Sequence, residues 1–60
     1  MYEKYIALRD EKGVTDYEVS KETGIAQSTF SDWKSGRSKP KVAKLLKIAK
    51  YFDVTIEALI

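Results

Sequence analysis

Small and polar side chains gather between residues 27 and 32, directly after a Gly-Ile-Ala turn. Phe30 and Trp33 are three residues apart, so they share one face of a helix and leave the opposite face to polar residues. Those polar residues are Gln27, Ser28, Ser31 and Asp32. An amide can pair with adenine, a hydroxyl can donate or accept, and a carboxylate can accept a hydrogen bond from the cytosine amine. The chemistry that these types permit is the reading of base edges in a DNA groove.

Asp32 has two interpretations, because a carboxylate is costly among phosphates. It either accepts a hydrogen bond from a cytosine amine or forms a local salt bridge with Arg37 or Lys34. The sequence leaves both open.

The middle of the chain is strongly basic. Residues 27–50 hold seven Lys or Arg and one Asp, whereas residues 1–26 hold four Lys or Arg and six Asp or Glu. Such an asymmetry is typical of a polyanion-binding surface. Hydroxyl and cationic side chains around the polar stretch are candidate phosphate ligands: Thr15, Thr29, Lys34, Ser35, Arg37, Ser38 and Lys39. Lys44, Lys47 and Lys50 are at helical spacing and indicate a solvated helix face.

Five short helices are expected to position these side chains. Three glycines each follow a helical pattern and are typical of the left-handed residue that ends a helix: Gly13, Gly24 and Gly36. Thr15 and Glu18 make a capping box that begins the second helix. Pro40 is expected in the first turn of the fourth helix, and Thr55 as the cap of the last one. The predicted helices span about residues 2–12, 16–23, 27–35, 41–52 and 56–60.

An apolar core is predicted from the inward positions of these helices. Its expected members are Tyr5, Leu8, Val14, Val19, Ile25, Phe30, Trp33, Val42, Leu45, Ile48, Ala49, Phe52, Val54, Ile56 and Leu59. Trp33 could instead stack on a base, but its spacing from Phe30 favours the core. The pattern predicts one compact all-α domain over residues 1–60.

Composition excludes several classes of protein. The 60 residues include no Cys and no His, so the usual zinc ligands, the thiol nucleophile and the commonest general base are missing. No catalytic residue, metal site, cofactor or small-molecule substrate is therefore expected. The apolar runs are too short to span a membrane, and the absence of cysteine suits the reducing cytoplasm.

The chain resembles the Cro/phage-repressor type of helix-turn-helix domain, also called the xenobiotic-response-element type. The resemblance covers about residues 5–60. It is carried by the segment T-D-Y-E-V-S-K-E-T-G-I-A-Q-S-T-F-S-D-W-K-S-G-R-S-K-P and by the closing segment L-L-K-I-A-K-Y-F-D-V-T-I-E-A-L-I.

This resemblance implies a compact five-helix, lambda-repressor-like domain that binds operator DNA, commonly as a two-fold dimer on a palindrome. It implies regulation of transcription, with the outcome expected to be repression, and a third helix that enters the major groove. The groove-facing positions of the family correspond to Gln27, Ser28 and Asp32. Its phosphate contacts correspond to Thr15, Ser35, Arg37, Lys39 and, as a weaker candidate, Arg9.

Three residues depart from the family pattern. Asp16 stands where many relatives have Gln near the DNA backbone, and an acid weakens a phosphate contact there. Ala26 replaces a Ser or Thr helix cap, and Asp53 replaces a Gly that precedes Val54.

The alternative hypothesis is a protein-interaction module of the same fold, such as an antitoxin or a phage accessory protein. Its basis is the apolar C-terminal end, where Ile56 and Leu59 are expected to cap the core. Ile60 and Tyr51 are expected to contribute to a homodimer through the last helix.

Overall fold

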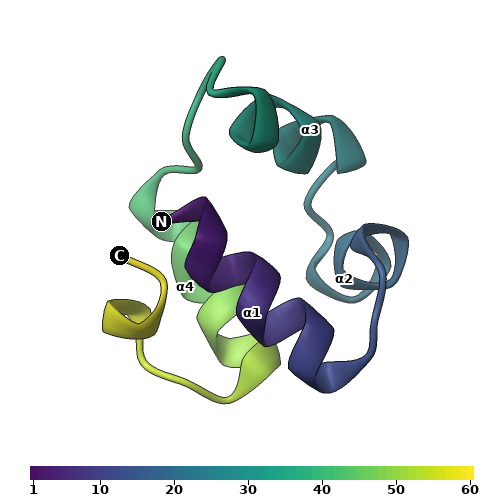
Figure 1. Cartoon of the computed structure of the whole chain (residues 1–60), viewed down its shortest axis with the longest axis vertical. Helices are drawn as coiled ribbons and strands as arrows, with labels where there is room; N and C mark the ends of the chain where they lie inside the picture. Colours follow the sequence, from purple (N-terminus) through teal and green to yellow (C-terminus); the bar gives the residue numbers. More distant parts are fainter.

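Four α-helices and a short 3₁₀ turn make up the computed structural model, which describes residues 1–60. The elements are α1 (Tyr2–Lys12), α2 (Asp16–Thr23), α3 (Gln27–Ser35), α4 (Val42–Phe52) and η1 (Ile56–Ala58). In Figure 1, α1 crosses in front of α4, α2 lies beside them, and α3 lies at one end of the molecule. The all-α prediction is confirmed, and the bounds of the first three helices agree with the expected ones.

The helix ends follow from the residues that the sequence places there. Thr15 Oγ1 accepts the backbone N–H of Glu18, and the Glu18 carboxylate accepts the N–H of Thr15, so the capping box is confirmed. Gly24 ends α2 with φ 76°, a left-handed conformation that costs glycine little. This turn sends the chain from α2 into α3, and Ile25 fills the angle between them with 3% of its surface exposed.

An aromatic cluster joins α1 to α3 and α4. The ring of Tyr5 stacks on Phe30 with centroids 5.1 Å apart and on Trp33 at 5.3 Å, and meets Phe52 edge-on at 6.1 Å. Trp33 is 4% exposed, so its assignment to the core is confirmed. Aromatic pairs of this geometry add about 0.5–1.5 kcal/mol beyond area burial. Tyr5 therefore fixes the tilt of α3 against the rest of the domain.

The core is smaller than the sequence predicts. Its buried apolar members are Tyr5, Val19, Ile25, Phe30, Trp33, Leu45, Ile48, Ala49 and Leu59. Five other expected members are only partly buried and pack around that cluster: Leu8, Val14, Phe52, Val54 and Ile56.

The prediction for the start of α4 was wrong in two respects. The helix begins at Val42 rather than at residue 41, and Pro40 lies before the helix instead of in its first turn. Val42 is 63% exposed, although it was expected in the core, whereas Pro40 is buried. Side chains of a helix tilt toward its N-terminus, so an apolar residue in the first turn points past the end of α4. Pro40 precedes the N-terminus of α4, and it is Pro40 rather than Val42 that is buried there.

The C-terminal segment also differs from the expected helix 56–60. Only Ile56–Ala58 is helical, as a 3₁₀ turn in which Leu59 N donates to Ile56 O at 2.9 Å. Thr55 stands at the cap position but makes no capping side-chain bond. So few residues favour the tighter 3₁₀ bonding over an α-helix. No helix in the structure has the length and apolar character needed to cross a bilayer.

Candidate nucleic-acid interface

The start of α3 presents exposed polar side chains and an uncapped helix end. Gln27, Ser28 and Ser31 are exposed, and the side-chain hydrogen bonds of this helix begin only at Ser35. Ala26 has the extended backbone of a cap residue but offers no side-chain acceptor, and the first turn holds no acid. Such a helix end leaves N–H groups and the positive end of the helix dipole available to an anion.

Asp32 is less exposed than the other three candidate base readers. It is half-buried and lines a hollow between α3 and the start of α4. The three ion pairs of the structure all lie elsewhere, around α1 and the start of α2, so the local salt bridge to Arg37 or Lys34 does not form. Its carboxylate is held by no cation in the free domain.

The basic loop after α3 is folded back on the end of that helix. The backbone N–H groups of Arg37 and Ser38 both donate to the carbonyl of Asp32, at 2.9 and 3.3 Å, and Ser35 Oγ donates to the same carbonyl. Arg37 and Lys39 are exposed and take part in no ion pair. The backbone of the loop is thus fixed while its cationic ends stay available.

The Thr15 hydroxyl, like that of Ser35, is already engaged in the free domain. Thr15 Oγ1 accepts from Glu18 N and donates to Glu18 Oε1, both at 3.2 Å. A phosphate at this place would have to displace Glu18. The remaining candidates Thr29, Lys34 and Ser35 lie on α3 itself.

Two lysines that sequence reasoning did not assign to the interface belong beside it. Lys41 and Lys44 line the same hollow as Thr29, Lys39 and Asp32. Spacing offered a signal: the two lysines are three residues apart, Lys41 at the N-cap and Lys44 in the first turn of α4, directly after the basic loop.

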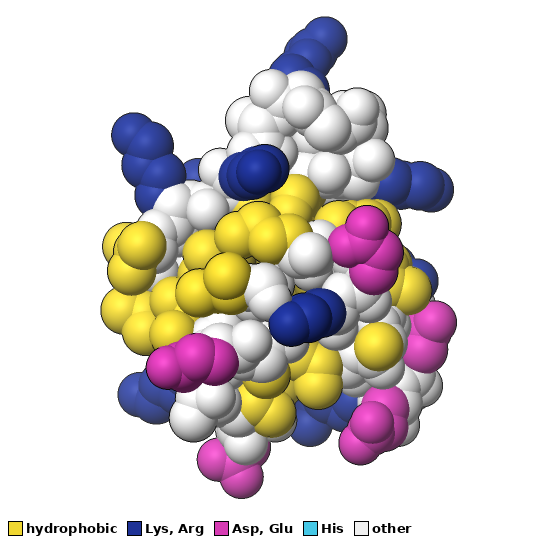
Figure 2. All heavy atoms as spheres, turned by 60° about the vertical axis from the view of Figure 1, so that its left-hand side comes forward, with side chains coloured by type: hydrophobic (Ala, Val, Ile, Leu, Met, Phe, Trp, Pro, Cys, Tyr) yellow, Lys and Arg dark blue, Asp and Glu magenta, His cyan; other side chains and the backbone are white.

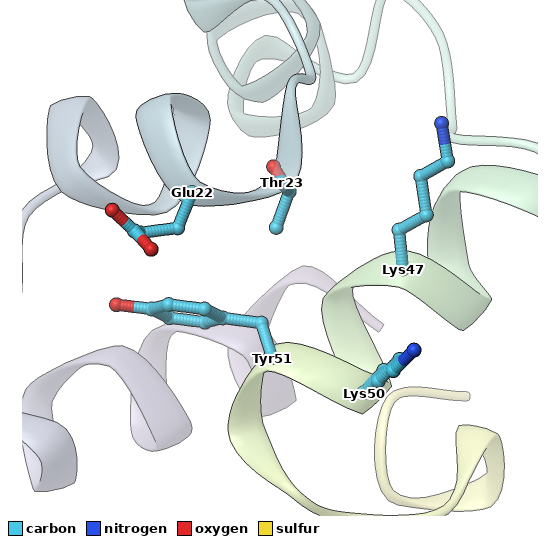
Figure 3. A pocket seen from close by; sticks show the side chains of 5 residues that line it. All are labelled: Glu22, Thr23, Lys47, Lys50 and Tyr51. Carbon is cyan, nitrogen blue, oxygen red and sulfur yellow. The ribbon is translucent and has the colours of Figure 1, made fainter.

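The lysines of α4 are all exposed, as expected of a solvated face, but they line two different hollows. Lys47 and Lys50 line a separate hollow of about 440 Å³ between α2 and α4, opposite Glu22 and Tyr51. Figure 3 shows the Tyr51 ring beneath the Glu22 carboxylate, with both lysines on the other side of the opening.

A cluster around Asp16 joins α1 to the first residue of α2, and sequence reasoning missed it. Asp16 Oδ1 accepts the Tyr5 hydroxyl at 2.6 Å and Arg9 Nη1 at 3.1 Å. Burial, together with the hydrogen bond to Asp16, raises the pKa of the Tyr5 phenol. The same carboxylate raises the pKa of Arg9 through its hydrogen bond. No sequence pattern reveals this cluster, because Asp16 lies seven residues from Arg9 and eleven from Tyr5, on a different helix.

Apolar side chains are exposed on the face that holds both chain termini. Figure 2 shows hydrophobic side chains gathered across its middle, while Lys and Arg project at the end where α3 lies and no Asp or Glu is visible there. Val42 and Leu46 of α4 are 63% and 52% exposed, and Ile60 is 56% exposed. Lys4 Nζ donates to the carbonyl of Ile60 at 2.6 Å, which places the C-terminus beside α1.

Tyr51 does not join that apolar face. It lines the hollow between α2 and α4, where Lys12 Nζ lies 5.2 Å from the centre of its ring. The expectation that Tyr51 and Ile60 act together finds no support in this arrangement.

Comparison with known proteins agrees with this geometry. The model of the helix-turn-helix family matches residues 6–59. The HTH-type transcriptional activator BcrR of Enterococcus faecalis is 33% identical over 58 residues, which cover 97% of this chain and 28% of that protein. The chain thus spans little more than a quarter of the length of that relative. No solved structure matches the present chain significantly. The chain belongs to the Cro/C1-type helix-turn-helix family, whose domains bind specific DNA sequences in transcription regulation.

Proposed function

We propose that this domain places α3 in the major groove of a specific double-stranded DNA site. The observation that carries the proposal is the start of α3, where Gln27, Ser28 and Ser31 are exposed without intramolecular partners. An α-helix fits the major groove, where each base pair presents a distinct pattern of donors and acceptors. Asp32, half-buried and without a cation, is the fourth reader and accepts from a cytosine amine.

The DNA backbone is held by the residues around that helix. The proposed phosphate ligands are Thr15, Thr29, Lys34, Ser35, Arg37 and Lys39, of which Arg37 and Lys39 carry unpaired charge on a fixed loop. Thr15 and Ser35 contribute least, because their hydroxyls are committed to Glu18 and to the Asp32 carbonyl. These contacts fix the register on the duplex and supply affinity that falls with salt.

Selection of bound duplexes from a random pool at low salt tests the proposal. An enriched sequence is the expected result. Gln27→Ala should then relax preference at one base pair, whereas Arg37→Ala should weaken all duplexes alike and lower the salt slope by about one. Retention without any enriched sequence, or an unchanged preference in Gln27→Ala, would contradict the assignment of α3.

A second copy of the domain is proposed to bind the other half of a palindromic site. Recognition helices on successive turns of the groove are about 34 Å apart, and the molecule measures 26 × 22 × 19 Å. Neighbouring copies therefore lie on the same side of the duplex, and a contact between them needs surfaces that face the two-fold axis. The contact is proposed to use the exposed apolar residues Val42, Leu46 and Ile60 rather than a C-terminal helix.

Sedimentation at several concentrations tests the dimer. Leu46→Glu should abolish association, and Tyr17→Glu should leave it intact, since Tyr17 is 59% exposed on α2. A strict monomer at high micromolar concentration, both free and on a full palindrome, would remove the homodimer.

Repression is the proposed regulatory outcome, because a bound domain blocks a promoter without a further contact. Activation is the second candidate, since the relative from Enterococcus faecalis is named as an activator. A reporter with the selected site overlapping the promoter, or upstream of it, distinguishes the two: repression lowers expression only from the overlapping site, whereas activation raises it from the upstream site. The proposed setting of this regulation is the cytoplasm.

A further inference from the structure

The guanidinium of Arg9 contacts two carboxylates, those of Asp16 and Asp10, and the contact with Asp16 is the stronger one. Its Nη1 donates to Asp16 Oδ1 at 3.1 Å, while Nε and Nη2 both face Asp10 Oδ1 at 3.4 and 3.3 Å. A planar guanidinium offers two edges for such contacts. In the free domain each edge is occupied by a different acid.

Asp16 holds its edge firmly. Its side chain is 34% exposed, and the same oxygen accepts the Tyr5 hydroxyl at 2.6 Å. Tyr5 is fully buried and stacked on two aromatic rings of α3, so its hydroxyl cannot move away from α2. The buried ring thus fixes Asp16, and Asp16 fixes Nη1 of Arg9.

Asp10 holds the other edge weakly. It is the sequence neighbour of Arg9, its side chain is 65% exposed, and both of its contacts are longer than the 3.1 Å contact of Arg9 with Asp16. One oxygen facing Nε and Nη2 occupies the place that an oxyanion takes on a guanidinium fork.

This fork lies where the DNA backbone is expected. Asp16 is the first residue of α2, which is the first helix of the motif. That helix crosses the backbone when the second one enters the groove.

We propose that Asp16, fixed by Tyr5, positions Arg9 to bind a DNA phosphate through its Nε and Nη2 edge, and that Asp10 occupies the place of that phosphate in the free domain. The proposal rests on the DNA-binding function above and deepens it. It explains how this chain keeps a backbone contact at a position where the family pattern has Gln and this sequence has an acid.

Whether DNA affinity rises or falls when an acidic side chain is removed distinguishes a positioning role of that acid from simple charge repulsion. Removing any acid from a polyanion-binding surface should strengthen binding if charge alone matters. Loss of a positioning residue should weaken binding in spite of the favourable change in charge.

Asp16→Asn and Asp10→Asn form a matched pair, because both remove one negative charge beside the same guanidinium. With the selected duplex, Asp10→Asn should bind about two- to fivefold more tightly, and Asp16→Asn about five- to tenfold more weakly. Arg9→Ala should lower the salt slope by about one. Equal or tighter binding by Asp16→Asn, or an unchanged slope in Arg9→Ala, would overturn the proposal.

Circular dichroism at the temperature of the titration checks that each variant is folded. The variant Tyr5→Phe supplies a second test. This variant keeps the stacked ring and removes only the hydroxyl, and it should weaken binding about two- to fourfold. Unchanged binding and salt slope in folded Tyr5→Phe would also overturn the positioning role. Failure of the unaltered domain to select any sequence would instead contradict the proposed function itself.

Discussion

The ring of Tyr5 stacks on the ring of Phe30 with centroids 5.1 Å apart and planes 20° apart, so the first helix packs directly on the third. Both side chains are fully buried. The orientation of α3 therefore depends on a residue that lies far from the polar face of that helix.

Tyr5→Leu should destabilise the domain strongly. The change removes a buried aromatic ring with four aromatic neighbours and its hydroxyl bond to Asp16, at a cost of about 2–4 kcal/mol. Urea unfolding followed by circular dichroism measures the loss. Tyr17→Leu is the control and should change stability by less than about 0.5 kcal/mol, since Tyr17 is exposed. Equal losses in the two variants would refute the role given to the cluster.

Ala26→Ser should stabilise the domain by about 0.5–1 kcal/mol. Ala26 already has the extended backbone of a cap residue, with φ −61° and ψ 143°, and lacks only an acceptor for the N–H groups of α3. Thr15→Ala should do the opposite by about 1 kcal/mol, because Thr15 caps α2. Thermal unfolding of both variants provides the measurement, and a lower midpoint for Ala26→Ser would count against it.

Two helix ends should respond oppositely to glycine. Asp53 closes α4 with φ 57°, so Asp53→Gly should add about 0.5–1 kcal/mol. Gly36 closes α3 with φ 80° and has open space around the position of a Cβ, so Gly36→Ala should cost about 1 kcal/mol through backbone strain alone. Denaturant unfolding measures both, and a neutral Gly36→Ala would show that the strain is relieved elsewhere.

Lys44→Ala and Lys50→Ala remove the same charge from different hollows. Lys44 lies with Thr29 and Lys39 beside α3, whereas Lys50 lies between α2 and α4. Lys44→Ala should lower the salt slope of DNA binding by about one, and Lys50→Ala by much less. Binding isotherms at several salt concentrations provide the comparison, and a Lys44→Ala slope equal to that of the unaltered domain would place Lys44 outside the interface.

Alkaline pH should destabilise the domain through Tyr5. The ordinary pKa of a tyrosine is 10.0, and burial with the hydrogen bond to Asp16 raises the pKa of this phenol in the folded state. The stabilisation from the protonated phenol is complete below pH 10.0 and is lost as pH rises toward the folded pKa. Urea unfolding at neutral and alkaline pH measures this loss. Tyr5→Phe should lose less stability over the same range, and an equal loss would assign the effect to other groups.

Local chemistry explains which parts of the fold could be predicted from the sequence. Gly24 and the pair Thr15 and Glu18 mark helix ends through bonds within a few residues, so those bounds are correct. The prediction that Val42 lies in the core was wrong, because periodicity gives the inward face of a helix but not where the elements that cover that face end. The predicted helix 56–60 was wrong as well, because helix propensity does not set the length of a terminal segment.

The candidate site also has features that the sequence predicts and features that it does not. The exposed face of α3 follows from the spacing of Phe30 and Trp33, which are both buried. The partners of Asp16 and the surroundings of Lys44 depend on contacts between helices, which no spacing within one helix encodes.

The side chains at the start of α3 take no part in holding the domain together, and this separates recognition from folding. Gln27, Ser28 and Ser31 are exposed, and their side chains make no hydrogen bond within the domain. New residue types at these three positions would change the preferred DNA site with little change in the free energy of unfolding. A single scaffold of this kind could therefore acquire new target sequences through a few substitutions, in evolution or by design.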